Sequence, residues 1–298
     1  MNKHLFRVIF NKARGIRMVV QETAASGGGQ GSDAATRSGG AGRGFAPAPL
    51  AAALALLLVS AAGLAQIRTD RAAPGGQRPT VLNSANGTPT VNIQTPSAAG
   101  VSRNSYSQFD IGGKGAILNN SRTAVQSRIG GWIQGNGALA RGSARVIVNE
   151  VNASAASQLM GALEVAGQRA DVIVANPSGL VVDGLYLINA AGVSLTTGRP
   201  LYGGGGSVEG FSVQNGLIQT QGLGLDATEA DYAHILARAV SLNAGVWAQD
   251  LCVVMGANEI AVDGQLRGAR SGAADRPQFA LDVAQLGGMY AGRIFIVG

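Results

Sequence analysis

The feature that most constrains this chain is a succession of short aliphatic runs separated by turn residues. From residue 79 onward the runs are rich in Val, Ile and Leu, and Gly, Asn or Asp usually stands between them. Several alternate apolar and polar residues, which is the periodicity of β-strands. The runs lie at 90–93, 144–151, 161–167, 171–175, 179–184, 192–198, 210–227, 237–246, 258–264 and 292–298. No long helical period follows residue 65, although 226–240 is compatible with one or two helical turns.

Many short strands with Gly, Asn or Asp corners allow a sandwich, a propeller or a solenoid. Glycine accounts for 45 of 298 residues and aromatics for only 5%, so large aromatic cores are excluded. A right-handed parallel β-helix is favoured over a sandwich, because small corner residues let coils stack and each coil buries aliphatic side chains against the next. Asn pairs such as Asn119-Asn120 suit side-chain ladders or turn caps.

The segment 171–185, DVIVANPSGLVVDGL, contains the clearest turn signal. Pro177 presets φ near −65°, and Gly179 accepts the left-handed conformation that a sharp turn needs. The segment therefore predicts strand, turn and strand.

The first 65 residues have the properties of an export signal. Residues 48–59 form an apolar run of a length typical of a signal-peptide core and too short for a stable membrane span. Gly63 and Ala65 then fit the small-residue positions of a cleavage site. We expect cleavage between Ala65 and Gln66, which divides the chain into a signal peptide, 1–65, and a β-helix domain, 66–298.

The charge distribution argues against a nucleic-acid partner. The net charge is +6, but residues 1–65 hold seven basic and two acidic residues. The remaining 233 residues hold sixteen basic and fifteen acidic ones, with Lys114 as their one lysine. A nucleic-acid surface needs a basic stripe, and this nearly neutral segment shows none.

The sequence predicts no enzyme, no cofactor and no metal site. The acidic residues are scattered as single charges, although Glu164 and Asp171 could meet on neighbouring strands as a polysaccharide-cleaving pair would. His234 lacks a G-x-S-x-G nucleophile elbow and is expected to be structural. Cys252 has apolar neighbours and is expected to be a buried small hydrophobe.

The amino-terminal block resembles the extended signal peptides of large autotransported and two-partner-secreted proteins of Gram-negative bacteria. The resemblance is specific because the block is ordered and not merely basic. The residues that carry it are Asn2, Lys3, Phe6, Arg7, Ile9, Phe10, Asn11 and Arg14.

The remainder resembles the amino-terminal two-partner secretion (TPS) domain of filamentous haemagglutinin-like exoproteins, a family of adhesins, haemolysins and contact-dependent inhibition toxins. The matching blocks are 89–111, 115–121, 128–136, 144–184, 195–200 and 286–298. The resemblance implies an all-β, right-handed parallel β-helix with an amino-terminal cap and a small extra-helical β element.

Three short motifs carry the site expectations, as partner-binding or fold motifs. Asn176, Pro177, Ser178 and Gly179 match the family's Asn-Pro-Asn-Gly turn, with Ser at the third position. The other two lie earlier in the chain. Asn119, Asn120 and Ser121 lie in the family's Phe-Asn-Asn region, with Leu118 at the aromatic position. Asn136 and Leu139 remain from the family's Asn-Pro-Asn-Leu motif, whose proline is absent here.

The resemblance implies a secreted, cell-surface protein. It would pass the Sec translocon and then an outer-membrane TpsB transporter, which has periplasmic POTRA domains and a β-barrel. Adhesion or toxin delivery normally belongs to a later region, so the chain is expected to be a truncated, fragmentary or minimal exoprotein. Two alternatives stay open: a free-standing adhesin that binds a host-cell or neighbouring-cell glycan, and a β-helical carbohydrate enzyme.

Overall fold

The computed structural model describes residues 6–11, 16–21, 67–269, 280–283 and 287–298. The chain forms two compact units, Met1–Leu58 and Val59–Gly298. In the first, β1 (Phe6–Asn11) pairs antiparallel with β2 (Ile16–Gln21). The expected signal cleavage at Ala65 and the apolar run 48–59 lie outside the described residues. No helix in the described part is long and apolar enough to cross a membrane.

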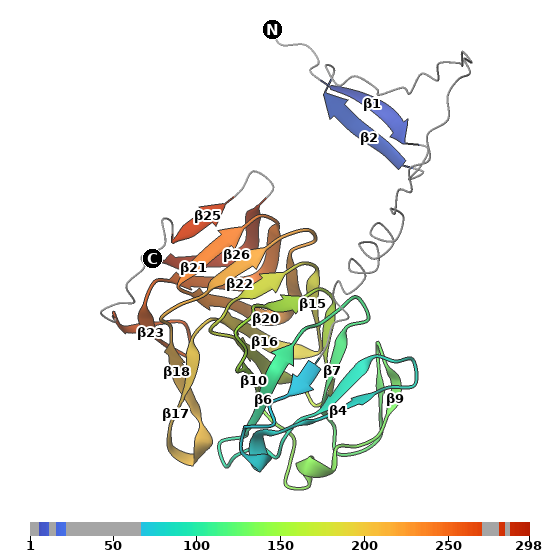
Figure 1. Ribbon diagram of the computed structural model, residues 1–298, viewed down its shortest axis with the longest axis vertical. Coiled ribbons are helices and arrows are strands. Elements are labelled where there is room, and N and C mark those ends of the chain that lie inside the picture. The colour runs from blue at the N-terminus through green and yellow to red at the C-terminus, as the bar shows by residue number, and fades with distance from the viewer. Residues whose placement is uncertain (1–5, 12–15, 22–66, 270–279, 284–286) are drawn as a thin grey trace, which may run out of the picture. The chain divides into compact units, whose positions relative to one another are not determined.

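The second unit is a parallel β-helix with three faces (Figure 1). Face 1 comprises β6 (Val101–Phe109), β10 (Val146–Val151), β13 (Ala170–Ala175), β16 (Ala190–Thr196) and the later parts of β20 (Leu225–Ala237), β22 (Gly245–Met255) and β26 (Gly288–Val297). Face 2 comprises β5 (Pro89–Asn92), β7 (Ala116–Asn120), β12 (Ala162–Gly167), β15 (Leu185–Ile188) and the earlier parts of β20, β22 and β26. Face 3 comprises β11 (Ser157–Leu159), β14 (Leu180–Val182), β19 (Leu217–Thr220), β21 (Ala239–Leu242) and β25 (Leu281–Val283).

Each coil visits the faces in turn, as β13, β14 and β15 do. The long strand β20 crosses the corner between faces 2 and 1, where its pairing with β22 is interrupted between Ala227 and Tyr232. The expectation that 226–240 could hold helical turns is therefore wrong. The alanines and aliphatic residues of 226–240 pair in parallel with neighbouring strands on both sides of a corner. This tertiary pairing overrides the helical preference of these residues.

Antiparallel additions complete the unit. At its amino-terminal end β3 (Ile67–Thr69) pairs with β6, and β4 (Thr80–Asn83) pairs with β5. Two insertions, far apart in sequence, form one extra-helical sheet from β17 (Arg199–Tyr202), β18 (Val208–Ser212), β23 (Asn258–Ala261) and β24 (Leu266–Ala269). A hairpin follows β7, with strands β8 (Val125–Ser127) and β9 (Gly131–Ile133). Three short 3₁₀ turns, η1 (Gly75–Gln77), η2 (Gly137–Leu139) and η3 (Gly204–Gly206), lie in the connections.

The core is a stack of aliphatic side chains inside the three faces. Val172, Val193 and Ile235 are fully buried on successive strands of face 1, and they belong to one cluster. Burying each such side chain contributes about 1.5–3 kcal/mol. A second cluster, which includes Ile173, Phe211 and Ile260, lies between face 1 and the extra-helical sheet. The expected all-β parallel β-helix, with its cap and extra-helical element, is confirmed.

Candidate functional site

The Asn176–Gly179 turn forms a corner within one coil, between β13 on face 1 and β14 on face 3. Asn176 is fully buried, and its side-chain amide donates to the oxygen of Ala155 and to the Ser157 hydroxyl, both at 3.0 Å. Its side-chain oxygen accepts from the Ser178 N–H at 2.9 Å. Gly179 has φ +113°, which favours glycine, and its N–H donates to the Asn176 carbonyl at 3.0 Å. Asn176 therefore satisfies polar groups of the preceding coil and of its own turn.

Only part of this turn reaches the surface. Asn176 and Gly179 are buried, Pro177 is half-buried, and Ser178 is exposed. The Ser178 hydroxyl donates to the Ala153 carbonyl at 2.6 Å. A partner that meets the folded domain can therefore touch Pro177 and Ser178 but not the Asn176 side chain.

The Asn119–Ser121 motif lies at the end of β7 and is buried. The Asn119 amide donates to the side-chain oxygen of Asn92 at 2.8 Å, which makes an asparagine ladder between neighbouring coils. The Asn120 amide donates to the carbonyls of Ala144 and Gln168, and its oxygen accepts from the Ala144 N–H at 2.7 Å. These bonds connect three segments that are far apart in sequence.

The Asn136–Leu139 motif keeps its turn without the proline. Asn136 is 3% exposed, and its amide donates to the carbonyls of Ile93 and Asn119 at 2.8 and 3.1 Å. Its side-chain oxygen accepts from the Ala138 N–H at 3.0 Å, which caps η2. Leu139 is fully buried in the core. The structure thus brings this motif together with Asn119 but places Asn176 on a different coil corner.

The two motifs close the base of segment 121–136, which contains the β8–β9 hairpin. The Asn136 N–H donates to the Ser121 carbonyl at 2.8 Å, and the Asn119 amide donates to the Gln134 carbonyl at 2.9 Å. The hairpin presents Trp132, whose side chain is 70% exposed. The buried asparagines therefore hold an accessible aromatic residue in place.

Glu164 is a buried structural support of this hairpin that the sequence did not reveal. It is 3% exposed, so the expectation of a single surface charge is wrong for this residue. Its carboxylate accepts from the Ser127 hydroxyl at 2.7 Å and from the N–H groups of Arg128 and Ile129 at 2.7 and 3.1 Å. Three donors offset the cost of burying the charge and fix the hairpin turn.

Glu164 and Asp171 do not form a catalytic pair. Glu164 lies on β12 in face 2, and Asp171 lies on β13 in face 1, and these two strands are not paired. The expectation that they could meet on neighbouring strands is wrong, because the chain turns a corner between them. Burial raises the pKa of Asp171, and a hydrogen bond from Tyr232 opposes that shift.

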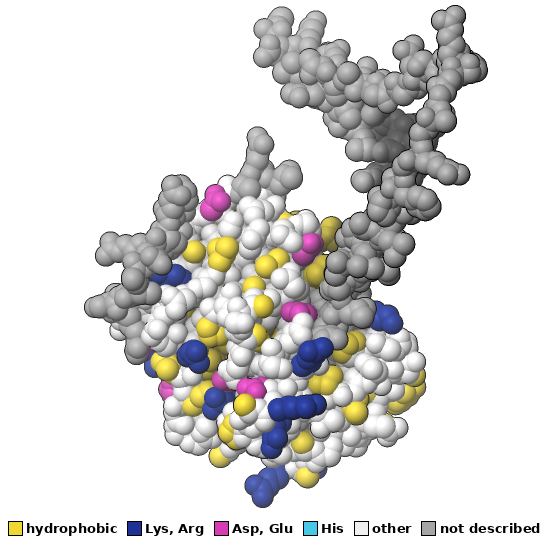
Figure 2. Space-filling view, viewed as in Figure 1, with side chains coloured by type: hydrophobic (Ala, Val, Ile, Leu, Met, Phe, Trp, Pro, Cys, Tyr) yellow, Lys and Arg dark blue, Asp and Glu magenta, His cyan; other side chains and the backbone are white. Residues whose placement is uncertain are grey.

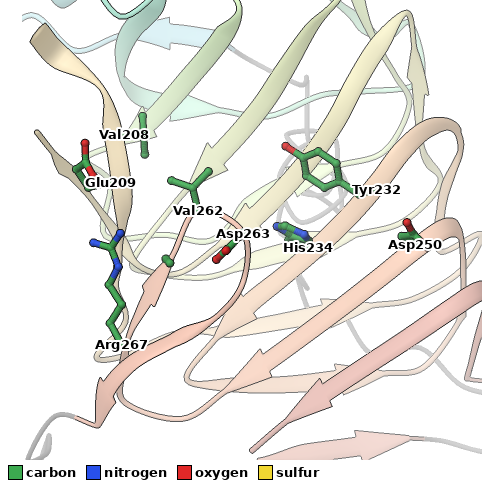
Figure 3. Close-up of a pocket in the computed structure, with 9 residues that line it drawn as sticks. Val208, Glu209, Tyr232, His234, Asp250, Val262, Asp263 and Arg267 are labelled. Carbon is green, nitrogen blue, oxygen red and sulfur yellow. The ribbon is translucent and has the colours of Figure 1, made fainter.

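His234 lines a hollow of about 580 Å³ at the edge of the extra-helical sheet (Figure 3). Burial lowers the pKa of this histidine, and neighbouring Asp263 opposes the shift. Its Nδ1 atom is buried without a hydrogen-bond partner. Cys252, its register partner on β22, is a free, buried cysteine, as expected, and burial raises the pKa of its thiol. A neutral thiol and a neutral imidazole do not make an activated nucleophile.

The described residues contain no group of three or more His, Cys, Asp or Glu side chains placed to hold a metal ion. The lining of the His234 hollow mixes carboxylates with one guanidinium, at Arg267.

A parallel β-helix with an amino-terminal cap, an extra-helical sheet and buried asparagine corners is the architecture expected of a secretion domain of the two-partner class. Residues 65–298 match the TPS secretion domain family, and residues 1–63 match the extended signal peptide of the type V secretion system. The chain belongs to the TPS secretion domain family. It is thus a two-partner-secreted exoprotein that is exported to the cell surface.

Individual relatives agree with this assignment. The chain is 47% identical over 308 residues to the toxin CdiA of Yersinia pestis and 44% identical over 303 residues to the tRNA nuclease CdiA-2 of Burkholderia pseudomallei. Both alignments include 100% of this chain but only 9% and 10% of those proteins. The crystal structure of a filamentous hemagglutinin secretion domain superimposes with a TM-score of 0.69 at 34% identity, covering 77% of each chain.

Proposed function

We propose that residues 66–298 direct export through an outer-membrane TpsB transporter. In this scheme the extended signal peptide brings the chain to the Sec translocon and is removed between Ala65 and Gln66. The periplasmic POTRA domains of the transporter then bind the mature chain before it enters the barrel. The family assignment supports this order of events.

The observation that carries the proposal is the burial of the motif side chains. Asn119, Asn120, Asn136 and Asn176 are each at most 3% exposed and are all hydrogen-bonded within the domain. A transporter that recognises these asparagine side chains must therefore bind them before the β-helix folds. Folding outside the cell then hides these side chains, and a folded β-helix cannot slide back through the barrel.

We propose further that the domain itself catalyses no reaction. Glu164, one member of the acidic pair that the sequence offered, has its carboxylate engaged by three donors of the hairpin turn. Burial raises the pKa of the Cys252 thiol and lowers the pKa of the His234 imidazole, so the neutral form of each group is favoured. The toxin and nuclease names of the relatives describe proteins of which this chain matches about a tenth. We place this chain at the export end of a contact-dependent inhibition system, with neighbouring cells as targets.

The test is secretion of the chain from a Gram-negative host with and without a TpsB transporter from the same kind of system. Transporter-dependent appearance in the medium, with Gln66 as the first residue of the secreted product, supports the proposal. Retention in the periplasm in the presence of every transporter tried, or secretion without one, overturns it. Mass spectrometry of the secreted product reads the cleavage position independently of the amount exported.

A further inference from the structure

A hollow of about 430 Å³ lies between two loops at the edge of face 1, beside the first coils. One loop contains Pro96–Gly100 and the other Arg141–Arg145. The lining residues are Pro96, Ser97, Ala98, Gly100, Arg141, Gly142, Ser143 and Arg145. The hollow thus has two guanidinium groups and two hydroxyl groups in its wall, and no carboxylate.

Arg145 is held in place by the opposite loop. Its Nη2 donates to the Ala99 carbonyl at 2.8 Å. Gly100, with φ +76°, lets the guanidinium lie against the backbone, because a Cβ there would stand 2.8 Å from the Arg145 Nε. One cation of the hollow is therefore fixed before any ligand arrives, which lowers the entropy lost on binding.

Arg141 supplies the second charge. Its side chain is exposed, and within the part of the chain that the structure describes no carboxylate pairs with Arg141 or Arg145. Arg103, a half-buried arginine on β6, differs from them because it pairs with Glu150 at 2.6 Å. Figure 2 shows Lys and Arg side chains gathered on the lower part of the face in view. Two unpaired guanidinium groups in one wall attract an oxyanion, which each can bind with two parallel hydrogen bonds.

Ser97 fixes the shape of the other wall. Its hydroxyl donates to the Gly206 carbonyl at 3.1 Å and accepts from the Val101 N–H at 3.2 Å, so the extra-helical sheet supports the loop 96–100. The Ser143 hydroxyl has no partner among the described residues and is available to a ligand. Pro96 and Ala98 add apolar surface against which a sugar ring can lie.

We propose that this hollow binds a monosaccharide unit that carries a phosphate or sulfate group. The two guanidinium groups and the Ser143 hydroxyl surround the tetrahedral oxyanion, and the Pro96 and Ala98 side of the hollow takes the sugar ring. The volume lies in the range of small-molecule sites and is larger than a bare oxyanion needs. The site goes beyond export, because it requires the folded domain and would act at the cell surface.

The experiment is calorimetric titration of the secreted chain with glucose 6-phosphate, glucosamine 6-sulfate, inorganic phosphate and glucose. We expect either or both anionic sugars to bind, with inorganic phosphate at least threefold weaker and glucose at least tenfold weaker. The phosphate and sulfate arms tell which oxyanion is preferred. Arg141→Gln and Arg145→Gln should each weaken binding at least fivefold, while Arg199→Gln, an exposed arginine on β17, should leave it unchanged.

Three results would overturn the proposal. They are no binding of either anionic sugar, binding of inorganic phosphate as tight as that of the sugars, and unchanged binding in both hollow variants. Circular dichroism of each variant confirms that the fold is kept. Arg141→Gln is the safer variant, because the Arg141 side chain makes no hydrogen bond to the described residues, so its loss of binding cannot be ascribed to a collapsed loop.

Discussion

The side-chain amide of Asn136 donates to the backbone oxygen of Asn119 at 3.1 Å, which makes one buried unit of two motifs that are seventeen residues apart. The same amide donates to Ile93 in the preceding segment. Both hydrogen bonds are buried inside the domain, so their loss should lower stability and leave the surface of the folded domain unchanged. Asn136→Ala should lower the free energy of unfolding by about 1–3 kcal/mol, because it leaves buried carbonyls without donors. Urea denaturation measures this, and an unchanged midpoint would contradict it.

Gly137→Pro should stabilise the domain. Gly137 is the first residue of η2, where proline is favoured, and a Cβ there meets no atom within 4 Å. Asn136 has φ −84° and ψ 109°, an extended conformation that a following proline accepts. The gain should be about 0.4–1 kcal/mol, since proline restricts the unfolded chain. Thermal unfolding tests it, with Gly131→Pro as the matched control: Gly131 has φ +71°, so proline must destabilise there.

Glu164→Gln should loosen the β8–β9 hairpin. The amide group of Gln cannot accept from all three donors that now point at the carboxylate, so at least one N–H or O–H loses its partner. We expect a loss of about 1–3 kcal/mol. Glu229→Gln is the control, because Glu229 is an exposed partner of Arg128 and should change stability little.

Trp132 gives this prediction a local readout. The hairpin carries the indole on its outer face, so loosening should change Trp132 fluorescence and its quenching by acrylamide before global unfolding. Replacing Trp247, the other tryptophan of the chain, by Phe isolates the signal. Identical quenching in Glu164→Gln and Glu229→Gln would mean that Glu164 does not hold the hairpin.

His234 should make stability depend on pH. Burial lowers its pKa in the folded state, so the neutral form is favoured there. The stabilisation is complete above the unfolded-state pKa, about 6.5, and is lost as pH falls from there towards the folded-state pKa. The groups around the ring are Asp263, which opposes the shift, Tyr232, whose ring centroid lies 4.5 Å away, and Cys252 on the neighbouring strand.

Melting temperatures at pH 8 and pH 5.5 test the His234 prediction. The melting temperature of the native protein should fall when the pH is lowered from 8 to 5.5, and that of His234→Gln should fall by a smaller amount. The melting temperature of Asp263→Asn should fall more than that of the native protein, because this change removes the carboxylate that favours the protonated ring. Equal pH dependence in the native protein and in His234→Gln would contradict the assignment.

The sequence predicts the aliphatic strands and the Asn176–Gly179 turn well, but it does not predict the corner within 226–240 or the burial of Glu164. Aliphatic runs such as 171–175 specify strands because each coil needs the same apolar positions facing inward. The pattern at 226–240 misleads, since a strand that crosses a corner breaks its own alternation between Ala227 and Tyr232. The burial of Glu164 cannot be predicted from its local sequence for another reason: its hydrogen-bond donors come from a hairpin more than thirty residues earlier. Both the strand that crosses the corner and the burial of Glu164 depend on the register between segments that are distant in sequence, and a local sequence pattern does not specify that register.

Asn176→Ala separates recognition from folding. The change removes a buried amide that serves two acceptors and an oxygen that serves the Ser178 N–H, so stability should fall by about 1–3 kcal/mol. A matched control is Thr220→Val on face 3, where a fully buried hydroxyl donates to the Ala244 carbonyl at 3.0 Å. Both variants lose buried hydrogen bonds, but only one lies in a family motif.

Transporter-dependent secretion of the two variants is then compared with their loss of stability. If the transporter reads Asn176 before the coils close, Asn176→Ala should be secreted at least several-fold less than Thr220→Val at equal stability. Ser178→Ala adds a second comparison, since Ser178 is the exposed residue of the folded turn. A secretion defect in Ser178→Ala that exceeds the one in Asn176→Ala would mean that the folded turn is read instead. Equal secretion of Asn176→Ala and Thr220→Val would leave the asparagine a folding role alone.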